Sequence, residues 1–196
     1  MNSADLPTIQ YTVWPKDLHG HRFQVKLRIA HPDAQGQILQ MPAWIPGSYL
    51  IRDFAKHIES IEAFASGSAK KRIALQRIDN NQWILPAVNG AVDIITTVYA
   101  FDNSVRAAYL DTERGFFNAT SLCLIAKGLT HTPCSLAIAP PEDAYAQLWT
   151  VQTSLTPAKK DTRGFGFYLA ANYDDLIDHP VAMGEFQMVR WNSNNT

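Results

Sequence analysis

The sequence predicts an all-β fold, either a β-sandwich or an open, strongly curved sheet, with one short helix near the C-terminus. Short segments with apolar residues at every second position recur along the 196 residues, and turns rich in Gly, Pro and Asn separate them. Only residues 171–178 are predicted to form a helix, of about two turns. This pattern favours packed sheets over a helical or α/β architecture.

The first two strands are expected to form a hairpin. Apolar residues alternate in residues 9–14, and they alternate more clearly in residues 21–29, where the intervening positions are Arg, Gln or Lys. The loop between them, residues 15–20, is short enough to join neighbouring antiparallel strands. We therefore predict a pair of half-buried strands.

The remaining strands are inferred from alternation and from their content of β-branched and aromatic residues. They cover residues 37–41, 57–65, 73–78, 82–86, 91–101, 105–110, 116–126, 134–138, 147–154, 166–170 and 181–191. Residues 57–65 also fit a helix, but the basic turn and the apolar run after them favour a hairpin of two strands. Residues 91–101 are expected to be buried on much of both faces.

Residues 41–54, M-P-A-W-I-P-G-S-Y-L-I-R-D-F, form the least regular apolar stretch. Two prolines and a glycine interrupt it, so the chain is expected to turn at Pro46–Gly47 and to become extended again near Tyr49. Because burial of a large apolar side chain contributes roughly 1.5–3 kcal/mol, the segment is expected to pack into a corner of the core. In the alternative, its polar groups line a groove or contact another domain. These groups are Ser48, Tyr49, Arg52 and Asp53.

The composition is that of an ordinary globular protein, long enough for one large domain or two small ones. The chain is 46% hydrophobic and 18% charged, with a net charge of −1, and its Lys and Arg residues are scattered. We therefore expect neither nucleic acid nor a membrane surface as a partner. No window has 18 consecutive apolar residues, and the first residues lack the features of a signal peptide, so a cytoplasmic location is expected.

The sequence shows no established catalytic motif. It lacks H-E-x-x-H, G-x-S-x-G, a P-loop and G-x-G-x-x-G. His19 and His21 could chelate a metal in principle, but no acidic or Cys partner accompanies them. Cys123 and Cys134 fit neither a redox pair nor a zinc knuckle, so free, buried thiols are expected.

Three other segments carry polar groups of interest. His179 stands between Asp178 and Pro180, and both a role near a site and a solvated helix end remain open. Arg106 and Asp111 are expected to form a buried pair that braces the sheet. In G-F-F-N, residues 115–118, core packing accounts for the aromatic residues, whereas Asn118 could cap a turn or bind a ligand. Taken alone, these residues define an all-β module without a visible active site.

Four segments together point to a known family. They are P-A-W-I-P-G-S-Y-L-I-R-D-F-A-K-H from residue 42, V-Y-A-F-D-N-S-V-R-A-A-Y-L-D from residue 98, G-F-F-N-A-T-S-L from residue 115, and N-Y-D-D-L-I-D-H-P-V-A-M-G-E-F from residue 172. In this order they resemble the N-terminal part of the glycyl aminopeptidase family. Its members are bacterial zinc metallopeptidases that also carry a thermolysin-like catalytic domain and a PDZ domain. The resemblance implies a fold similar to the β-rich N-terminal domain of aminopeptidase N relatives.

The resemblance also implies where the chemistry lies. The zinc ligands and the general base belong to the H-E-x-x-H helix of the following domain, so zinc is expected in the full-length protein and no cofactor in this chain. Without zinc no bound water has its pKa lowered to near 7, so the chain is not expected to hydrolyse peptides alone. Residues 1–178 would be the N-terminal β-domain, and residues 179–196 the first strand of the truncated catalytic domain or its linker. The implied partners are this chain's own catalytic domain and, in the full-length protein, a peptide substrate.

The terminal segment is the part expected to lie nearest to the reaction. In aminopeptidase N relatives a G-x-M-E-N strand lies along the substrate and offers a carboxylate to its free α-amine. Residues 181–186, V-A-M-G-E-F, resemble this strand, which makes Glu185 a candidate for that role, against a plain exposed strand residue. The full set of candidates for a substrate groove is Glu185, His179, Asp178, Tyr49, Arg52 and Asn118.

Three functional hypotheses follow. The first is a non-catalytic domain that braces a zinc aminopeptidase and walls its cleft, which requires an exposed apolar patch larger than a few hundred Å². The alternative is a stand-alone β-sandwich that binds peptide or carbohydrate on a platform of Trp44, Tyr49 and Phe117. The third is an independent enzyme with a site around Asp178 and His179.

Overall fold

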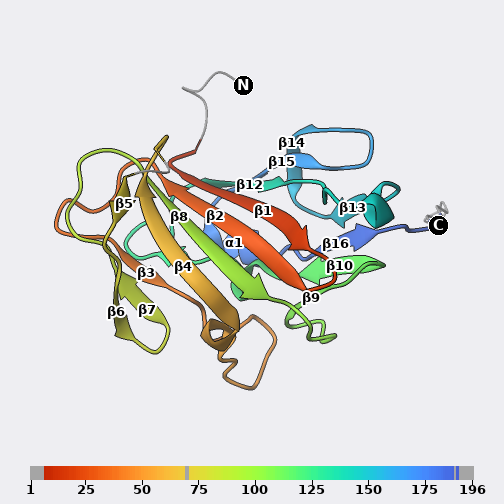
Figure 1. Ribbon diagram of the computed structural model, residues 1–196, viewed down its shortest axis with the longest axis horizontal. Coiled ribbons are helices and arrows are strands. Elements are labelled where there is room, and N and C mark those ends of the chain that lie inside the picture. The colour runs from red at the N-terminus through yellow and green to blue at the C-terminus, as the bar shows by residue number, and fades with distance from the viewer. Residues whose placement is uncertain (1–6, 69–70, 188, 190–196) are drawn as a thin grey trace, which may run out of the picture.

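The computed structural model describes residues 7–68, 71–187 and 189, which form three open sheets and little helix. The largest sheet has eight strands in the order β14-β15-β12-β1-β2-β8-β4-β5, and its central strands cross Figure 1 side by side. Their bounds are β14 (Thr156–Lys160), β15 (Gly166–Ala170), β12 (Cys134–Ile138), β1 (Ile9–Asp17), β2 (Arg22–Ile29), β8 (Val92–Tyr99), β4 (Ile58–Ala65) and β5 (Arg72–Ile73). Neighbouring strands are antiparallel except β1 and β12, which are parallel. The prediction of a curved, all-β fold is confirmed.

The central strands show why this sheet forms. In β1, β2 and β8 every second side chain is buried, while the others are half-buried or exposed. Val25 of β2 pairs with Val13 of β1 and Thr96 of β8 in this register. The predicted hairpin of the first two strands is therefore confirmed. The second face of β8 is only half-buried, less covered than the sequence suggested.

Two four-stranded sheets flank the large one at opposite sides of Figure 1. One has the order β13 (Thr150–Thr153), β16 (Val181–Gly184), β10 (Arg114–Phe117) and β9 (Ala108–Leu110). The other has the order β11 (Ile125–Ala126), β3 (Ile38–Gln40), β7 (Gln82–Ile84) and β6 (Gln76–Asp79). Three short 3₁₀ segments connect strands: η2 (Phe54–His57), η3 (Ala119–Ser121) and η4 (Ala144–Ala146).

The core lies between the large sheet and a layer formed by residues 117–126 and helix α1 (Tyr173–Ile177). Phe23 packs edge-on against Phe117, with ring centroids 5.6 Å apart. The hydroxyl of Tyr11 donates to the carbonyl of Leu124 (2.8 Å), and the hydroxyl of Tyr173 donates to that of Cys123 (2.7 Å). These bonds tie β1 and α1 to the same buried segment and satisfy its carbonyl groups.

Helix α1 is capped as its sequence indicates. The side chain of Asn172 accepts a bond from the backbone N–H of Asp175 (2.9 Å), and the carboxylate of Asp175 accepts one from the N–H of Ala171 (2.8 Å). This reciprocal arrangement satisfies two N–H groups at the helix start. Within the described part of the chain, no helix is long and apolar enough to cross a membrane.

Both cysteines are free and buried, as predicted. Burial raises the pKa of Cys134 to about 12, and it raises the pKa of Cys123 further. Neither thiol is available as a thiolate near neutral pH.

Three strand predictions need correction. Residues 116–126 are not one strand, because Asn118 donates to the carbonyl of Val105, Ser121 donates to the carbonyl of Asn118, and the chain forms η3 between β10 and β11. Residues 73–78 do not form one strand. Ile73 belongs to β5 and pairs with β4, whereas β6 pairs with β7 in another sheet. Strand β14 escaped prediction because T-P-A-K-K is exposed throughout and shows no alternation, as is usual at a sheet edge.

The last strand is shorter than predicted. Residues 181–191 were expected to be extended, but β16 ends at Gly184, and residues 188 and 190–196 lie outside the described part. β16 is hydrogen-bonded on both sides, to β10 and to β13, which precede it in the chain. The assignment of residues 179–196 to a following domain stays a prediction.

Candidate functional site

The segment between β3 and η2, residues 41–53, is a loop that we call the corner loop; it protrudes at the lower edge of Figure 1. The N–H of Ser48 donates to the carbonyl of Ile45 (3.1 Å), and Gly47 has φ of +79°, as a type II turn requires after proline. The indole N–H of Trp44 donates to the carbonyl of Ser48 (2.7 Å). Local bonds therefore give the loop a defined shape without pairing in a sheet.

The corner loop exposes most of its large apolar side chains. Met41, Ile45 and the following Phe54 are buried, whereas Trp44 is 52%, Leu50 66% and Ile51 86% exposed. Tyr49 is as accessible as in an extended peptide, at 104%. The expectation that this stretch packs into the core is wrong for these four side chains, because the loop extends beyond the sheets and nothing in the described chain covers it.

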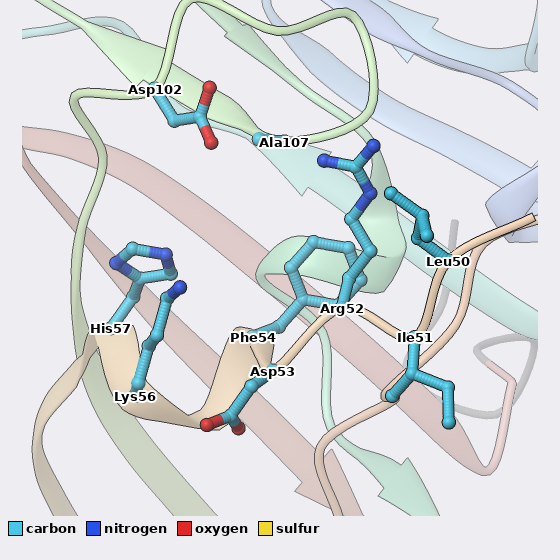
Figure 2. Close-up of a pocket in the computed structure, with 9 residues that line it drawn as sticks. All are labelled: Leu50, Ile51, Arg52, Asp53, Phe54, Lys56, His57, Asp102 and Ala107. Atoms are coloured by element: carbon cyan, nitrogen blue, oxygen red, sulfur yellow. The ribbon is translucent and has the colours of Figure 1, made fainter. Parts of the chain in front are cut away.

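A cavity of about 170 Å³ lies where the corner loop meets η2 and the turn of residues 102–107 (Figure 2). We call it the Arg52 cavity; its lining residues are Leu50, Ile51, Arg52, Asp53, Phe54, Lys56, His57, Asp102 and Ala107. In Figure 2 the guanidinium of Arg52 extends toward Ala107, while the carboxylate of Asp53 points away from it. The backbone N–H of Arg52 donates to the carbonyl of Ala43 (2.6 Å), which fixes the start of this side chain.

The charges in this cavity are incompletely paired. Nε of Arg52 is buried and has no hydrogen-bond partner, and no carboxylate of the described residues lies within 4.0 Å of its guanidinium. Burial, together with the neighbouring Lys56 ammonium, lowers the pKa of His57 from its ordinary value of 6.5. Among the residues that surround Arg52, the sequence argument missed Lys56, His57 and Asp102. The closely spaced charged residues in R-D-F-A-K-H, residues 52–57, could have indicated Lys56 and His57.

A second hollow, of about 150 Å³, lies on one face of the sheet that contains β9, β10 and β16. Phe116, Tyr109 and Ala182 share this face through the strand register, and Phe186 closes one side. The guanidinium of Arg114 lies 4.9 Å from the centre of the Tyr109 ring and donates to Oδ1 of Asn103 (2.7 Å). This hollow is mainly apolar, in contrast to the Arg52 cavity.

The expected ion pair between Arg106 and Asp111 is not formed. Arg106 is exposed, and Asp111 instead accepts a bond from the hydroxyl of Tyr109 (2.7 Å) and from backbone N–H groups of the turn that follows. These hydrogen-bond donors satisfy the Asp111 carboxylate without an ion pair to Arg106.

Two of the six candidate residues lie at the 102–107 turn. Arg52 lines the Arg52 cavity together with Asp102 and Ala107, and the side chain of Asn118, which is buried, donates to the carbonyl of Val105 (2.6 Å). Tyr49 belongs to the corner loop but does not line the cavity. Glu185 is exposed directly beyond β16, next to Phe186 of the apolar hollow. The turn is thus a wall shared by the two hollows, and contacts of these residues with a substrate stay predictions.

The other two candidates lie elsewhere and do not act as a pair. Nδ1 of His179 shares a hydrogen bond with the hydroxyl of Ser154 (2.6 Å), and its Nε2 faces Asp175 at 3.4 Å. Asp178 is exposed. The hypothesis of an Asp178–His179 enzyme site therefore finds no pair in this geometry.

The aromatic platform of the binding-module hypothesis is not assembled. Trp44 and Tyr49 are exposed, but Phe117 is completely buried against Phe23. A platform for a sugar ring or a peptide needs its aromatic faces in solvent, so this alternative is not favoured.

The described residues do not fit a zinc site. Nowhere in residues 7–68, 71–187 and 189 do three His, Cys, Asp or Glu side chains gather closely enough to hold a metal ion. The rings of His19 and His21 have different neighbours: His19 packs on Tyr145, and Nδ1 of His21 is 2.6 Å from the carbonyl oxygen of Leu110.

Fold and site together define a mostly β domain with open sheets and an exposed apolar loop. Residues 10–185 match the family model described as Peptidase M61 N-terminal domain, so the chain belongs to the Peptidase M61 N-terminal domain family.

Two solved structures illustrate what the chain is similar to. The chain is similar to an aminopeptidase N family protein from Idiomarina loihiensis, with 41% identity and a TM-score of 0.88 over 95% of this chain and 31% of that one. It also aligns with an M1 zinc metallopeptidase from Deinococcus radiodurans, at 5% identity and a TM-score of 0.49, over 92% of this chain and 42% of the other. No curated protein matches the chain. The chain spans less than half the length of each of these two proteins.

Proposed function

We propose that this chain is the non-catalytic N-terminal domain of a zinc-dependent aminopeptidase-type metallopeptidase, which braces the catalytic domain and walls one side of its substrate cleft. The exposed apolar surface of the corner loop carries this proposal. Tyr49, Leu50 and Ile51 extend into solvent from a loop whose backbone is held by its own hydrogen bonds. An ordered, solvent-facing apolar cluster of this kind is typical of a surface that another polypeptide covers.

The length of the similar Idiomarina protein supports the same proposal. This chain covers 31% of that protein, which leaves enough polypeptide there for further domains. By resemblance, the following part would contain a thermolysin-like catalytic domain and a PDZ domain, and its H-E-x-x-H helix would hold the zinc. Zinc bound there would lower the pKa of a water molecule and make it a nucleophile at neutral pH.

This chain's own share of the reaction would be binding and positioning. Glu185, exposed beyond β16, would offer a carboxylate to the free α-amine of a peptide. Tyr49 and Arg52 would lie at the boundary between the two domains. We further propose a location in the cytoplasm, on the basis of the sequence alone.

Activity measurements on two lengths of the protein test this function. We expect the complete polypeptide encoded by the gene to hydrolyse glycyl- and alanyl-p-nitroanilide, and to lose this activity with a chelator and regain it with Zn²⁺. We expect the 196-residue chain alone to be inactive with or without zinc. Turnover by the chain alone, or a complete polypeptide without zinc-dependent activity, would contradict the proposal.

The bracing role has a separate test in the complete polypeptide. Ile51→Ser should lower its melting temperature and its activity, because it places a hydroxyl in the proposed interface. Leu148→Ser is the matched control, since Leu148 is also exposed (68%) but lies near η4, away from the corner loop. Equal effects of the two substitutions would contradict the assignment of the corner loop as the interface.

A further inference from the structure

We propose that the Arg52 cavity binds a carboxylate group carried on a short apolar body, with the Arg52 guanidinium as its charged partner. The site consists only of described residues of this chain, so it would function without zinc and without a second domain. Neither the family model nor the similar structures name a ligand for these residues.

The first step is the unsatisfied guanidinium. Arg52 is half-buried, and its Nε–H is shielded from solvent and donates to no acceptor among the described residues. Leaving a buried donor of a charged group unpaired is costly, because the group has lost water and gained nothing in return. The guanidinium presents its donors in a planar fork that matches the two oxygens of a carboxylate. Because Nε itself is shielded from solvent, a carboxylate in the cavity would pair with the Nη groups of this fork.

The second step is the balance of charge, which distinguishes a carboxylate from a phosphate. Arg52 and Lys56 bring two positive charges to the cavity, and Asp53 and Asp102 bring two negative ones. Figure 2 shows the Asp53 carboxylate directed away from Arg52, while Asp102 lies across the cavity from it. Asp102 would repel a dianion more strongly than a group with a single negative charge, so the single charge fits this arrangement better.

The third step is size and lining. The cavity holds about 170 Å³, which is below the range of about 300–1,000 Å³ usual for drug-sized ligands. Leu50, Ile51, Phe54 and Ala107 give it apolar walls beside the charged groups. It therefore suits a short fragment of a polypeptide, either the C-terminal residue of a peptide or the side chain of an Asp or Glu.

Nuclear magnetic resonance of the arginine Nε–H groups in the purified protein tests the inference. We expect N-acetylglycine to shift the Arg52 Nε signal in a saturable way, with a Kd in about the millimolar range, as expected for so small a ligand. N-acetylglycinamide, which has the same body without the charge, should leave the signal in place. The absence of saturable binding by N-acetylglycine, or tighter binding of inorganic phosphate, would overturn the proposal.

Substitutions make the test specific to this cavity. Arg52→Lys should weaken binding at least about fivefold, because an ammonium lacks the planar fork. Asp102→Asn should strengthen it about threefold, because it removes a repelling charge. Arg106→Gln is the matched control, since Arg106 is exposed on the same turn but outside the cavity lining. A response to Arg106→Gln equal to that of Arg52→Lys would overturn the proposal, even if Arg52→Lys also perturbs the fold.

Two peptides then identify the source of the carboxylate. One has a free C-terminus and no acidic side chain, acetyl-Ala-Gly; the other has an internal aspartate and an amidated end, acetyl-Ala-Asp-Ala-amide. Tighter binding of the first assigns the cavity to the end of a peptide chain. Tighter binding of the second assigns it to an acidic side chain of a docked polypeptide. Failure of both peptides to displace N-acetylglycine would overturn the polypeptide assignment.

Discussion

Residues 44–51, W-I-P-G-S-Y-L-I, and residues 115–124, G-F-F-N-A-T-S-L-C-L, have much the same composition but opposite environments. In the second segment Phe117, Leu122 and Leu124 are at most 2% exposed. In the first, Tyr49 and Ile51 are almost completely exposed. Aromatic and aliphatic content alone therefore does not determine burial; the neighbours that the fold supplies do.

The two segments also differ in what holds them. Residues 115–117 pair with β9 and β16, and the carbonyls of Cys123 and Leu124 accept bonds from tyrosines of α1 and β1. The corner loop is held largely by bonds between its own residues, such as that from the Ser48 hydroxyl to the carbonyl of Leu50 (3.1 Å). We infer that the buried segment stabilises the domain, whereas the corner loop is free to contact another molecule.

Substitution of an aromatic residue in each segment is the strongest test of this comparison. Phe117→Ala should lower the free energy of unfolding by about 3–5 kcal/mol, because it leaves a cavity beside Phe23 in the core. Tyr49→Ala should change it by no more than about 0.5 kcal/mol, because Tyr49 makes no buried contact. Urea unfolding of the purified protein, followed by circular dichroism, measures both values.

Phe117→Leu is the control for this pair. It keeps most of the buried volume, so its cost should lie well below that of Phe117→Ala. If Tyr49→Ala destabilised the protein as much as Phe117→Ala, the corner loop would be a structural element and the comparison would fail.

The strands of the large sheet were predicted well because alternation within a strand can be recognised from neighbouring residues alone. Alternation in residues 9–14 and 21–29, and the exact ranges of β12 and β15, reflect strands with one buried face. The prediction failed where contacts between residues distant in the sequence determine the structure. For example, η3 interrupts an apolar run because Asn118 bonds to Val105, thirteen residues away. Strand β14 has no apolar face to detect.

The candidate site was only partly predictable for the same reason. The prolines of the corner loop distinguish it in the sequence, and Arg52 is one of its predicted site residues. Its meeting with Asp102 and Ala107 depends on how β4, β8 and β9 place two distant turns together, which residue spacing does not reveal. The exposure of Tyr49 could not be predicted either, because an apolar stretch in a soluble chain is usually expected to be buried in the core.

The two segments can also be compared through one glycine in each, Gly47 and Gly115. A methyl group on Gly115 would lie 2.6 Å from Cγ of the buried Met183, so Gly115→Ala should cost about 1–3 kcal/mol through overpacking. A methyl group on Gly47 would meet no atom within 4 Å, but φ there is +79°, so Gly47→Ala should cost about 1 kcal/mol through strain alone.

Gly47→Asn separates strain from packing at the loop position. Asparagine tolerates positive φ better than alanine, so this variant should be closer to the wild type in urea unfolding. If Gly47→Ala cost more than Gly115→Ala, crowding in the buried segment would not be the larger effect, and the comparison would need revision.

The smallest expected effect concerns pH at the Arg52 cavity. Burial, with a contribution from Lys56, lowers the pKa of His57, and Asp102 and Asp53 act weakly in the opposite direction. Because the folded-state pKa lies below the unfolded value of 6.5, the imidazole is neutral in both states above that value, and its contribution to stability is then fully present. As the pH falls from 6.5 through the folded-state pKa, the unfolded chain binds the proton first and this stability is lost.

We expect this loss to be below about 1 kcal/mol, because His57 is only partly buried and solvent screens its charge. His57→Gln should remove it, so that the stability difference between wild type and variant changes between pH 7.5 and pH 5 in urea titrations. Lys56→Gln should make the loss smaller, since it removes one cause of the lowered pKa. A wild-type stability that rises as the pH falls, relative to His57→Gln, would mean that the carboxylates dominate and that the cavity favours cations, contrary to a site for a carboxylate.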